Sequence, residues 1–191
     1  MNREDEGMTD KEYFESLPPG FRFSPLDDEL IEVYLTRKLK NLDLPRNRIH
    51  EVEFSKERPE TLIDSFVCTF FGFLFGFRNY EAATEGMWYF FSPMMKKYPN
   101  GGRPDRQAQG GFWKITSNQQ SVFRQDVDGG KTKVGFKTCL DFYRGERDDE
   151  DNKTDWKIHE YKTVAQYSHA LDKRNRDSNS PKVRTISNNN M

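Results

Sequence analysis

Short runs of aromatic and β-branched residues, separated by turn signals, constrain the fold of this chain most. The runs cover residues 87–91, 111–116, 121–124, 134–137, 139–143 and 155–161. Runs of this length and composition are typical of β-strands. Asp128-Gly129-Gly130 lies between the third and the fourth run and predicts a hairpin turn. Consecutive short strands joined by turns predict an antiparallel β-sheet.

Residues 25–40 have instead the spacing of an amphipathic helix. The apolar positions that recur at helical spacing are Leu26, Leu30, Val33, Tyr34 and Leu39. Ser24 is the expected N-cap, Pro25 takes the first helical position, and acidic residues follow where they complement the helix dipole. An extended arm at 17–23, one helix and then a sheet together predict an α+β fold.

The formal net charge of -1 hides an uneven distribution along the chain. Residues 88–144 contain ten basic and four acidic residues, whereas 1–16 and 145–161 are acidic. The local field, rather than the net charge, governs the attraction of a protein to a polyanion. The basic block therefore permits nucleic-acid binding by a chain that is close to neutral as a whole.

The histidines and cysteines of the chain form no recognisable catalytic or metal site. Cys68 and Cys139 are far apart in the sequence, and the histidines have no second ligand at zinc-site spacing. No glycine-rich phosphate loop and no nucleophile motif is present. The uncharged run at 65–77 is interrupted by two glycines and is shorter than the roughly 20 residues of a spanning helix. We therefore expect no enzyme activity, no cofactor, no metal, no small-molecule substrate and no membrane partner.

Five segments of the chain form a series that points to one family. The first is Leu-Pro-Pro-Gly-Phe-Arg-Phe at 17–23, followed by Pro-x-Asp-Asp-Glu-Leu at 25–30. The others are Trp-Tyr-Phe-Phe-Ser-Pro at 88–93, Lys-Tyr-Pro-Asn-Gly-x-Arg-Pro-x-Arg at 97–106, Gly-Phe-Trp-Lys-x-Thr at 111–116 and Lys-Thr-Asp-Trp-x-Ile-His-Glu-Tyr at 153–161. In this order they resemble the signatures of the plant NAC-domain transcription factors, from about residue 17 to 163.

This resemblance implies a twisted antiparallel β-sheet packed between a few helices. It also implies dimerisation through the N-terminal arm and binding of double-stranded DNA by a strand that enters the major groove. By position, Leu17, Arg22 and Glu29 match the dimer interface, with Arg22 and Glu29 as a salt-bridge pair between subunits. The positions that match the DNA-binding face are Lys97, Arg103, Arg106, Lys114, Lys133 and Lys137.

The segment after Lys114 is where the resemblance places the contacts with bases. Trp113 is expected to support this strand from the core, and Asn118, Gln119 and Gln120 carry amides that suit adenine edges. The family commonly has a glycine and then a lysine in this segment, and a lysine-rich loop where residues 145–151 are acidic. Each lost phosphate contact lowers the log–log salt slope by about 0.9. We therefore expect weaker and less specific DNA binding than is usual in the family.

Composition divides the chain into three parts. Residues 1–16 are an acidic extension, 17–163 form the DNA-binding and dimerisation domain, and 164–191 are a polar tail that we expect to be disordered. The tail contains Lys-Arg-Asn-Arg at 173–176, a weak nuclear-import signal, and we expect a nuclear protein. The phenylalanine-rich run at 66–79 is atypical of the family, and either an inserted element or translated intron sequence accounts for it.

Two functions are compatible with these features. The first is a sequence-specific DNA-binding transcription regulator that acts as a homo- or heterodimer with NAC-domain proteins. The second is a protein-interaction module that dimerises with full-length NAC proteins and inhibits them, with little DNA binding of its own. The retained basic positions favour the first, whereas the acidic loop at 146–151 and the short tail favour the second.

Overall fold

The computed structural model describes residues 7–52, 58–63, 82–93, 106–146, 149–171 and 181–188. Its helical segments are α1 (Asp10–Ser16), α2 (Asp27–Glu29), η2 (Leu30–Leu35), α3 (Thr36–Leu39), α4 (Pro59–Ile63), η3 (Glu150–Asn152) and α5 (Val164–Leu171). Its strands are β1 (Ile49–Glu51), β2 (Met87–Ser92), β3 (Gln107–Ala108), β4 (Gly111–Ile115), β5 (Gln120–Gln125), β6 (Lys131–Arg144), β7 (Lys153–Thr163) and β8 (Lys182–Asn188). The phenylalanine-rich run at 66–79 lies outside the described residues.

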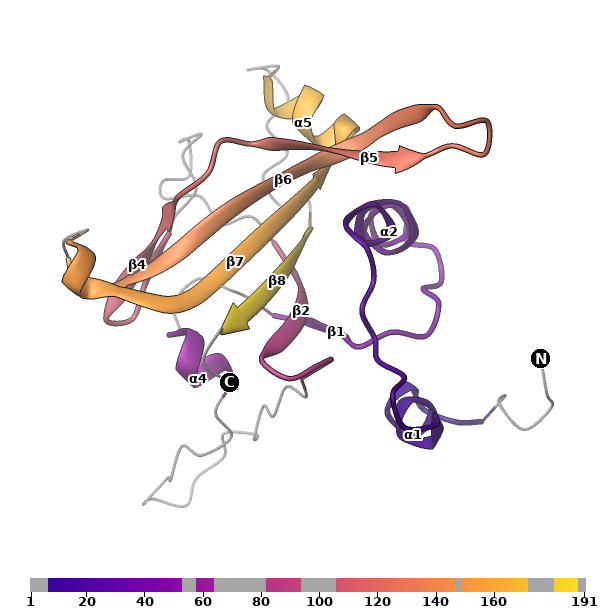
Figure 1. Ribbon diagram of the computed structural model, residues 1–191, viewed down its shortest axis with the longest axis horizontal. Helices are drawn as coiled ribbons and strands as arrows, with labels where there is room; N and C mark the ends of the chain where they lie inside the picture. Colours follow the sequence, from indigo (N-terminus) through magenta and orange to yellow (C-terminus); the bar gives the residue numbers. More distant parts are fainter. Residues whose placement is uncertain are drawn as a thin grey trace.

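The strands form one curled, mostly antiparallel sheet. Their order is β1-β2-β8-β7-β6-β4-β3, with β5 also paired to β6. The pair β1–β2 is parallel, so the sheet is mixed. The runs at 134–137 and 139–143, predicted as separate strands, form the single 14-residue strand β6. In Figure 1, β6 and β7 run side by side as long neighbouring strands.

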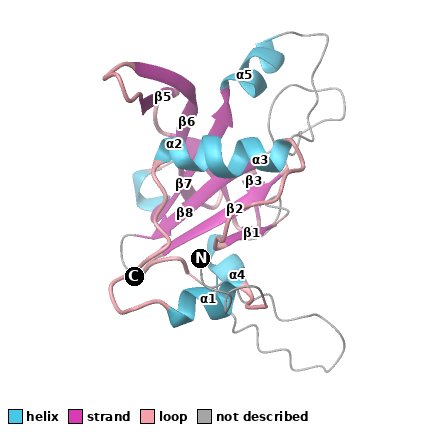
Figure 2. Ribbon diagram, turned by 90° about the vertical axis from the view of Figure 1, so that its right-hand side faces the viewer, coloured by secondary structure: helices cyan, strands magenta, loops and turns pink. Residues whose placement is uncertain are grey.

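The predicted helix forms from Asp27 to Leu39, with a π-helical middle over Leu30–Leu35. It begins later than predicted, because its N-cap is Leu26 and not Ser24. Leu26 has no side-chain acceptor, and Glu29 Oε2 instead accepts a hydrogen bond of 2.7 Å from the Leu26 N–H. Figure 2 shows this helix lying across the strands on one side of the sheet.

Close packing of this helix on the sheet requires a glycine at position 135. A Cβ atom on Gly135 would lie 2.9 Å from Ile31 Cδ1 and 2.2 Å from the Lys162 carbonyl oxygen. Real Cβ atoms essentially never approach other heavy atoms this closely. The absence of a side chain on β6 therefore lets the helix and β7 both approach the same point.

An apolar cluster fills each face of the sheet. On the helix face the cluster consists of Phe23, Leu30, Ile31, Leu35, Ala83, Tyr89, Phe91, Val122, Tyr161 and Val183. On the opposite face it consists of Val52, Leu62, Trp88, Phe90, Trp113, Leu140, Phe142, Trp156, Ile158 and Ile186. Successive side chains of a strand point to opposite faces. The odd-numbered residues at 135–143 of β6 and 157–163 of β7 therefore point to the helix face.

The polar tail predicted to be disordered contains regular structure. Val164–Leu171 forms α5, and Lys182–Asn188 forms β8, which lies between β2 and β7 and pairs antiparallel with both. Val183 and Ile186 of β8 are fully buried. The prediction is wrong for these segments because the polar average of the tail hides the apolar side chains that the two neighbouring strands bury.

A buried ion cluster joins β7 to β8 on the face opposite the helix. Glu160 Oε1 lies 2.8 Å from Lys182 Nζ and 3.4 Å from Lys162 Nζ, and its Oε2 lies 3.1 Å from Arg184 Nη2. Burial alone would raise the pKa of the Glu160 carboxyl, but the three cations outweigh this effect and lower it. Glu160 therefore stays ionised at neutral pH and ties the C-terminal strand into the sheet.

The acidic N-terminal extension contains the helix α1. Thr9 and Glu12 form a capping box, in which Glu12 Oε2 accepts a hydrogen bond of 2.7 Å from the Thr9 N–H. Phe14 of α1 packs edge-to-face on Phe23, with ring centroids 5.7 Å apart. Among the helices that the structure describes, none is long and apolar enough to cross a membrane.

Candidate nucleic-acid interface

One continuous segment, 111–125, runs along one side of β6, and because β3 pairs only with its first two residues, Gly111 and Phe112, the remainder forms an edge. β4 pairs with residues 140–144 of β6 and β5 pairs with residues 131–137, so both strands lie on the same side of it. The crossing between them is fixed at Cys139, whose carbonyl oxygen accepts a 3.1 Å hydrogen bond from the Thr116 N–H. The Cys139 N–H in turn donates to Ser117 Oγ over 3.2 Å. The edge segment thus has an anchored turn in its middle.

The side chains of this turn are available to a partner. Thr116, Asn118, Gln119 and Gln120 are all exposed. Asparagine and glutamine amides can donate and accept hydrogen bonds simultaneously, which suits the adenine edge in the major groove. The turn therefore exposes amide groups that could contact base edges, and its backbone is fixed by hydrogen bonds to the sheet.

Lys114 and Trp113 of β4 point to opposite faces of the sheet. The Lys114 Nζ lies 5.2 Å from the centroid of the Tyr143 ring, and Tyr143 also stacks on Phe112 with centroids 5.7 Å apart. Trp113 is buried, and its ring lies 5.0 Å from that of Phe142. The prediction that Trp113 supports the strand from the core is confirmed.

The other predicted DNA-contacting cations differ in their placement. Arg106 precedes β3, its side chain is half-buried, and its carbonyl oxygen accepts a 2.9 Å hydrogen bond from the Trp113 N–H. Lys133 is exposed on β6, with its Nζ 4.7 Å from the centroid of the Phe136 ring. Lys97 and Arg103 lie outside the described residues.

Lys137 faces inward, in contrast to its predicted place among the DNA contacts. Its Nζ donates to both carboxylate oxygens of Asp27, at 2.9 and 3.2 Å, and its side chain is only 18% exposed. The Tyr161 hydroxyl donates to the same carboxylate over 2.6 Å. Burial, and then the Asp27 charge and hydrogen bond, raise the pKa of Tyr161, which keeps its proton. The trio attaches the helix to β6 and β7, so we assign Lys137 a structural role.

Asp27 and Tyr161 are the residues that sequence reasoning missed in this trio. An acidic residue in a first helical turn is explained by the helix dipole alone. Its hydrogen-bond partners lie 110 and 134 residues away along the chain. No local pattern in the sequence signals a contact over that separation.

The N-terminal arm at 17–23 is exposed except at its end. Leu17 is half-buried, and Phe23 is buried in the helix-face cluster. Phe21 and Leu26 are each 65% exposed. Two large apolar side chains are therefore accessible beside the proline-stiffened segment.

The predicted interface pair does not form within the chain. Arg22 is exposed, and its Nη1 donates to the Phe21 carbonyl oxygen over 2.9 Å. Glu29 is exposed, and one of its carboxylate oxygens accepts a hydrogen bond from the Leu26 N–H. Among the described residues no ion pair joins Arg22 to Glu29, which leaves both charges available to another subunit.

An acidic turn joins β6 to β7 at the end of the sheet where β4 also lies. Among its described residues, Glu146, Asp149, Glu150 and Asp151 are exposed. After it, Lys153 Nζ lies 3.3 Å from Asp141 Oδ2. The hydrogen bond to Asp141, and more weakly the charge of Glu150, raise the pKa of Lys153. The turn places negative charge next to the candidate DNA-binding edge.

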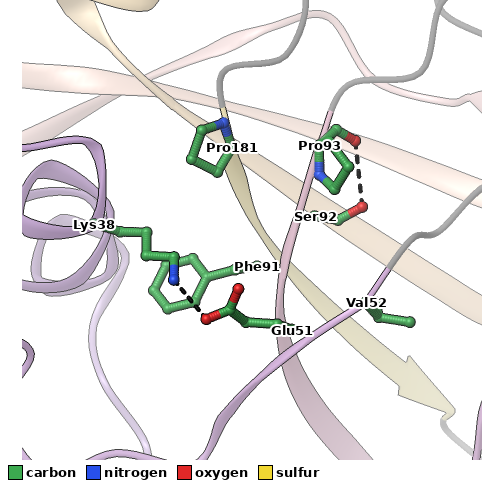
Figure 3. Close-up of a pocket in the computed structure, with 7 residues that line it drawn as sticks. All are labelled: Lys38, Glu51, Val52, Phe91, Ser92, Pro93 and Pro181. Carbon is green, nitrogen blue, oxygen red and sulfur yellow. Dashed lines mark hydrogen bonds and ion pairs between the residues drawn. The ribbon is translucent and has the colours of Figure 1, made fainter. Parts of the chain in front are cut away.

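A hollow of about 430 Å³ lies at the opposite edge of the sheet (Figure 3). Lys38 and Glu51 form an ion pair across it, with the Lys38 Nζ 5.4 Å from the centroid of the Phe91 ring. The Ser92 hydroxyl donates to the Pro93 carbonyl oxygen over 3.3 Å. Three of the residues that line this hollow, Lys38, Glu51 and Phe91, thus already contact one another.

Comparison with known proteins follows the same boundaries as the motifs. The profile of the family described as "No apical meristem (NAM) protein" matches residues 18–163. The barley relative (Hordeum vulgare subsp. spontaneum) named NAC transcription factor NAM-B1 is 41% identical over 148 residues, which are 76% of this chain and 32% of the relative. In Arabidopsis thaliana, NAC transcription factor 56 is 42% identical over 78% of this chain and 36% of the relative.

A further Arabidopsis thaliana relative, NAC transcription factor 29, is 41% identical over 77% of this chain and 47% of the relative. The chain therefore spans between a third and a half of the length of these relatives. A profile match over most of the chain, at these levels of identity, shows the family. The chain belongs to the NAC (NAM) domain family, which is a family of transcription factors and not of enzymes.

Proposed function

We propose that this protein is a sequence-specific DNA-binding regulator of transcription that acts in the nucleus as a dimer. The observation that carries the proposal is the anchored, exposed turn at 116–120, on an edge segment of a chain whose family is shown. Relatives that cover this domain are named as transcription factors. The nuclear-import candidate at 173–176 supports the location and lies outside the described residues.

In the proposed complex the edge segment enters the major groove and the turn meets the bases. The amides of Asn118, Gln119 and Gln120 read adenine edges, which are distinct in that groove. Lys114, Arg106 and Lys133 contact phosphates on either side, with Lys97 and Arg103 joining them from outside the described residues. Phosphate contacts fix the register of the strand, and base contacts supply the sequence preference.

In the proposed dimer, the arm of one subunit covers the exposed apolar side chains of the other. Arg22 of each subunit pairs with Glu29 of its partner, so a two-fold axis forms the pair twice. Leu17 lies in the short strand that the two arms form together. The same interface accepts another NAC-domain protein, because an arm of the same sequence pattern supplies the same contacts.

A second function, inhibition of full-length NAC proteins, is favoured by one observation. Among the described residues the turn between β6 and β7 exposes four carboxylates beside the DNA-binding edge. Negative charge there repels phosphates and weakens DNA binding. A chain that dimerises well and binds DNA poorly removes its partner from shared sites.

Selection of bound duplexes from a random DNA pool, performed with the purified full chain alone and with a co-expressed NAC-domain protein, tests both functions. Enrichment of one motif by the chain alone supports the DNA-binding regulator. Enrichment only with the partner, at reduced yield compared with the partner alone, supports the inhibitor. If neither preparation enriches a motif and no salt-sensitive gel shift is seen, the DNA-binding proposal fails.

The dimer is tested by light scattering after size exclusion. Arg22→Glu places two like charges at each contact and is expected to yield monomers. Lys40→Glu, at the C-cap of α3 and away from the arm, makes the same charge change on an exposed residue and serves as the control. Unchanged dimerisation of Arg22→Glu would remove the arm interface from the proposal.

A further inference from the structure

The part of the helix face that the helix leaves uncovered carries a row of charges across three strands. The register places Lys114 of β4 opposite Asp141 of β6, and Asp141 opposite Lys157 of β7. All three side chains point to the helix face, because Trp113, Leu140 and Ile158 beside them belong to the cluster of the other face. The helix-face apolar cluster reaches β7 only at Tyr161, four residues beyond Lys157.

The row has an excess of positive charge. Lys153 adds a third ammonium through its 3.3 Å contact with Asp141. Asp155, between Lys153 and Lys157 on the same face of β7, is a second carboxylate, so the row holds three lysines and two carboxylates. Glu150 acts on Lys153 from the acidic turn, outside the row, as a further negative charge. His159, the next residue on this face of β7, is kept uncharged at neutral pH, since burial and then Lys137 lower its pKa, with Lys157 acting in the same direction.

Lys157 is the residue of the row whose charge is not matched. Within the described part of the chain, no ion pair or hydrogen bond joins its ammonium to another side chain, and it is half-exposed. It lies on an interior strand, where an unmatched lysine gains nothing for the stability of the sheet. An ammonium in this position is suited to an anion from outside the chain.

We propose that Lys157, with Lys114 and Lys153, forms a phosphate-binding row that contacts the sugar–phosphate backbone of duplex DNA. The inference rests on the proposed function. Neighbouring strands lie about 4.8 Å apart, so the backbones at Lys114 and Lys157 are about 10 Å apart, close to the axial rise of three phosphates of one DNA strand. The row extends from the candidate edge at β4 across β6 to β7. Its lysines offset part of the negative charge of the acidic turn.

The test compares three variants of the full chain on a duplex chosen by the selection experiment, by fluorescence anisotropy from 50 to 200 mM NaCl. Lys157→Gln is expected to lower the log–log salt slope by about 0.9 and to weaken binding by about eightfold near 0.1 M salt. Lys11→Gln removes the same charge from α1, which lies with His50 and Glu51 at the opposite edge of the sheet, and should leave both values unchanged. Lys157→Arg keeps the charge and should bind like the wild type.

The outcomes separate the row from the proposed function. If the wild type binds and Lys157→Gln keeps the wild-type slope and affinity, the row is overturned and the proposed function stands. If the wild type itself binds no duplex at low salt, both fail. A drop for Lys157→Gln with an unchanged thermal midpoint, restored in Lys157→Arg, supports the row, whereas a drop in all three variants contradicts it.

Discussion

Asp141 and Glu160 are carboxylates on neighbouring strands, each beside lysines, but they point to opposite faces of the sheet. Both are mostly buried, with side-chain exposures of 9% and 13%. The cations around Glu160 are shielded to different degrees, with side-chain exposures of 3% for Lys182, 12% for Arg184 and 23% for Lys162. The cation bound by Asp141 is Lys153, whose side chain is 38% exposed.

The different solvent exposure of the surrounding cations gives the two carboxylates different roles. Around Glu160 two of the three cations, Lys182 and Arg184, are largely shielded from water, so the carboxylate is required to keep them in the fold. Around Asp141 the ammonium groups reach solvent, so they tolerate the loss of the carboxylate and can bind an external anion. Removing one charge at a time tests whether exposure decides these roles.

The largest effect is expected for Glu160→Gln. The substitution leaves Lys182, Lys162 and Arg184 in place without their carboxylate, and breaking a buried ion cluster in this way costs about 3–5 kcal/mol. Urea unfolding followed by circular dichroism measures the loss. Glu146→Gln, an exposed acid in the turn, is the matched control and should change little. A loss for Glu160→Gln as small as that of the control would show that the cluster does not support the sheet.

The pH dependence of stability tests whether the charge of Glu160 is what stabilises the fold. Because the pKa of Glu160 is lowered in the folded state, the unfolded state binds the proton more tightly. Its contribution is complete above the unfolded pKa of about 4.3 and is lost as the pH falls below that value. The stability gap between the wild type and Glu160→Gln should therefore narrow from pH 6 to pH 3. A gap that stays constant over this range would assign the loss to packing and not to charge.

A smaller effect is expected for Asp141→Asn. The amide keeps an acceptor for the Thr116 hydroxyl, which donates to Asp141 Oδ1 over 3.4 Å. The free energy of unfolding should fall by about 1 kcal/mol, the scale of the one hydrogen bond with Lys153 that is weakened. Removal of the negative charge should also tighten DNA binding at low salt, because Lys153 loses its ion-pair partner and Lys157 loses the carboxylate opposite it on β6. Asp43→Asn, beyond the end of the helix, is the control. Weaker DNA binding by Asp141→Asn would mean that the carboxylate positions the lysines.

Local patterns in the sequence predicted the strands that carry the candidate site. The aromatic and β-branched runs at 111–116 and 155–161 identified β4 and β7, and the family resemblance correctly placed Trp113 in the core. β8 and β1 were not predicted, because their pairing partners lie elsewhere in the chain. In addition, β8 has a polar composition and β1 is only three residues long. Whether such a segment becomes a strand depends on the distant strands that it can pair with, and a short stretch of sequence does not contain them.

The charges of the site show the same limit. The chemistry of Lys114 and Lys137 looks alike in the sequence, but Lys137 is bound by Asp27 and Lys114 lies over Tyr143. Lys157 occupies one position in a strand-like run, and only the register reveals that it lies in a row with Asp141 and Lys114. Family motifs assign residue types to positions, whereas the fold decides which charges are already matched.

The smallest effect is expected at a third cluster, which is open to solvent. Arg124 of β5 joins Glu32 of the helix at 2.8 Å and Asp126 of the hairpin at 3.0 Å, and the pKa of Asp126 is lowered first by the Thr132 hydroxyl and then by Arg124. Arg124→Ala should leave the thermal midpoint nearly unchanged, because exposed ion pairs contribute little. Amide exchange of the β5–β6 hairpin should become faster, since its link to the helix is lost. If Arg124→Ala destabilised the fold as strongly as Glu160→Gln, burial would not be the property that separates structural ion clusters from surface ones in this chain.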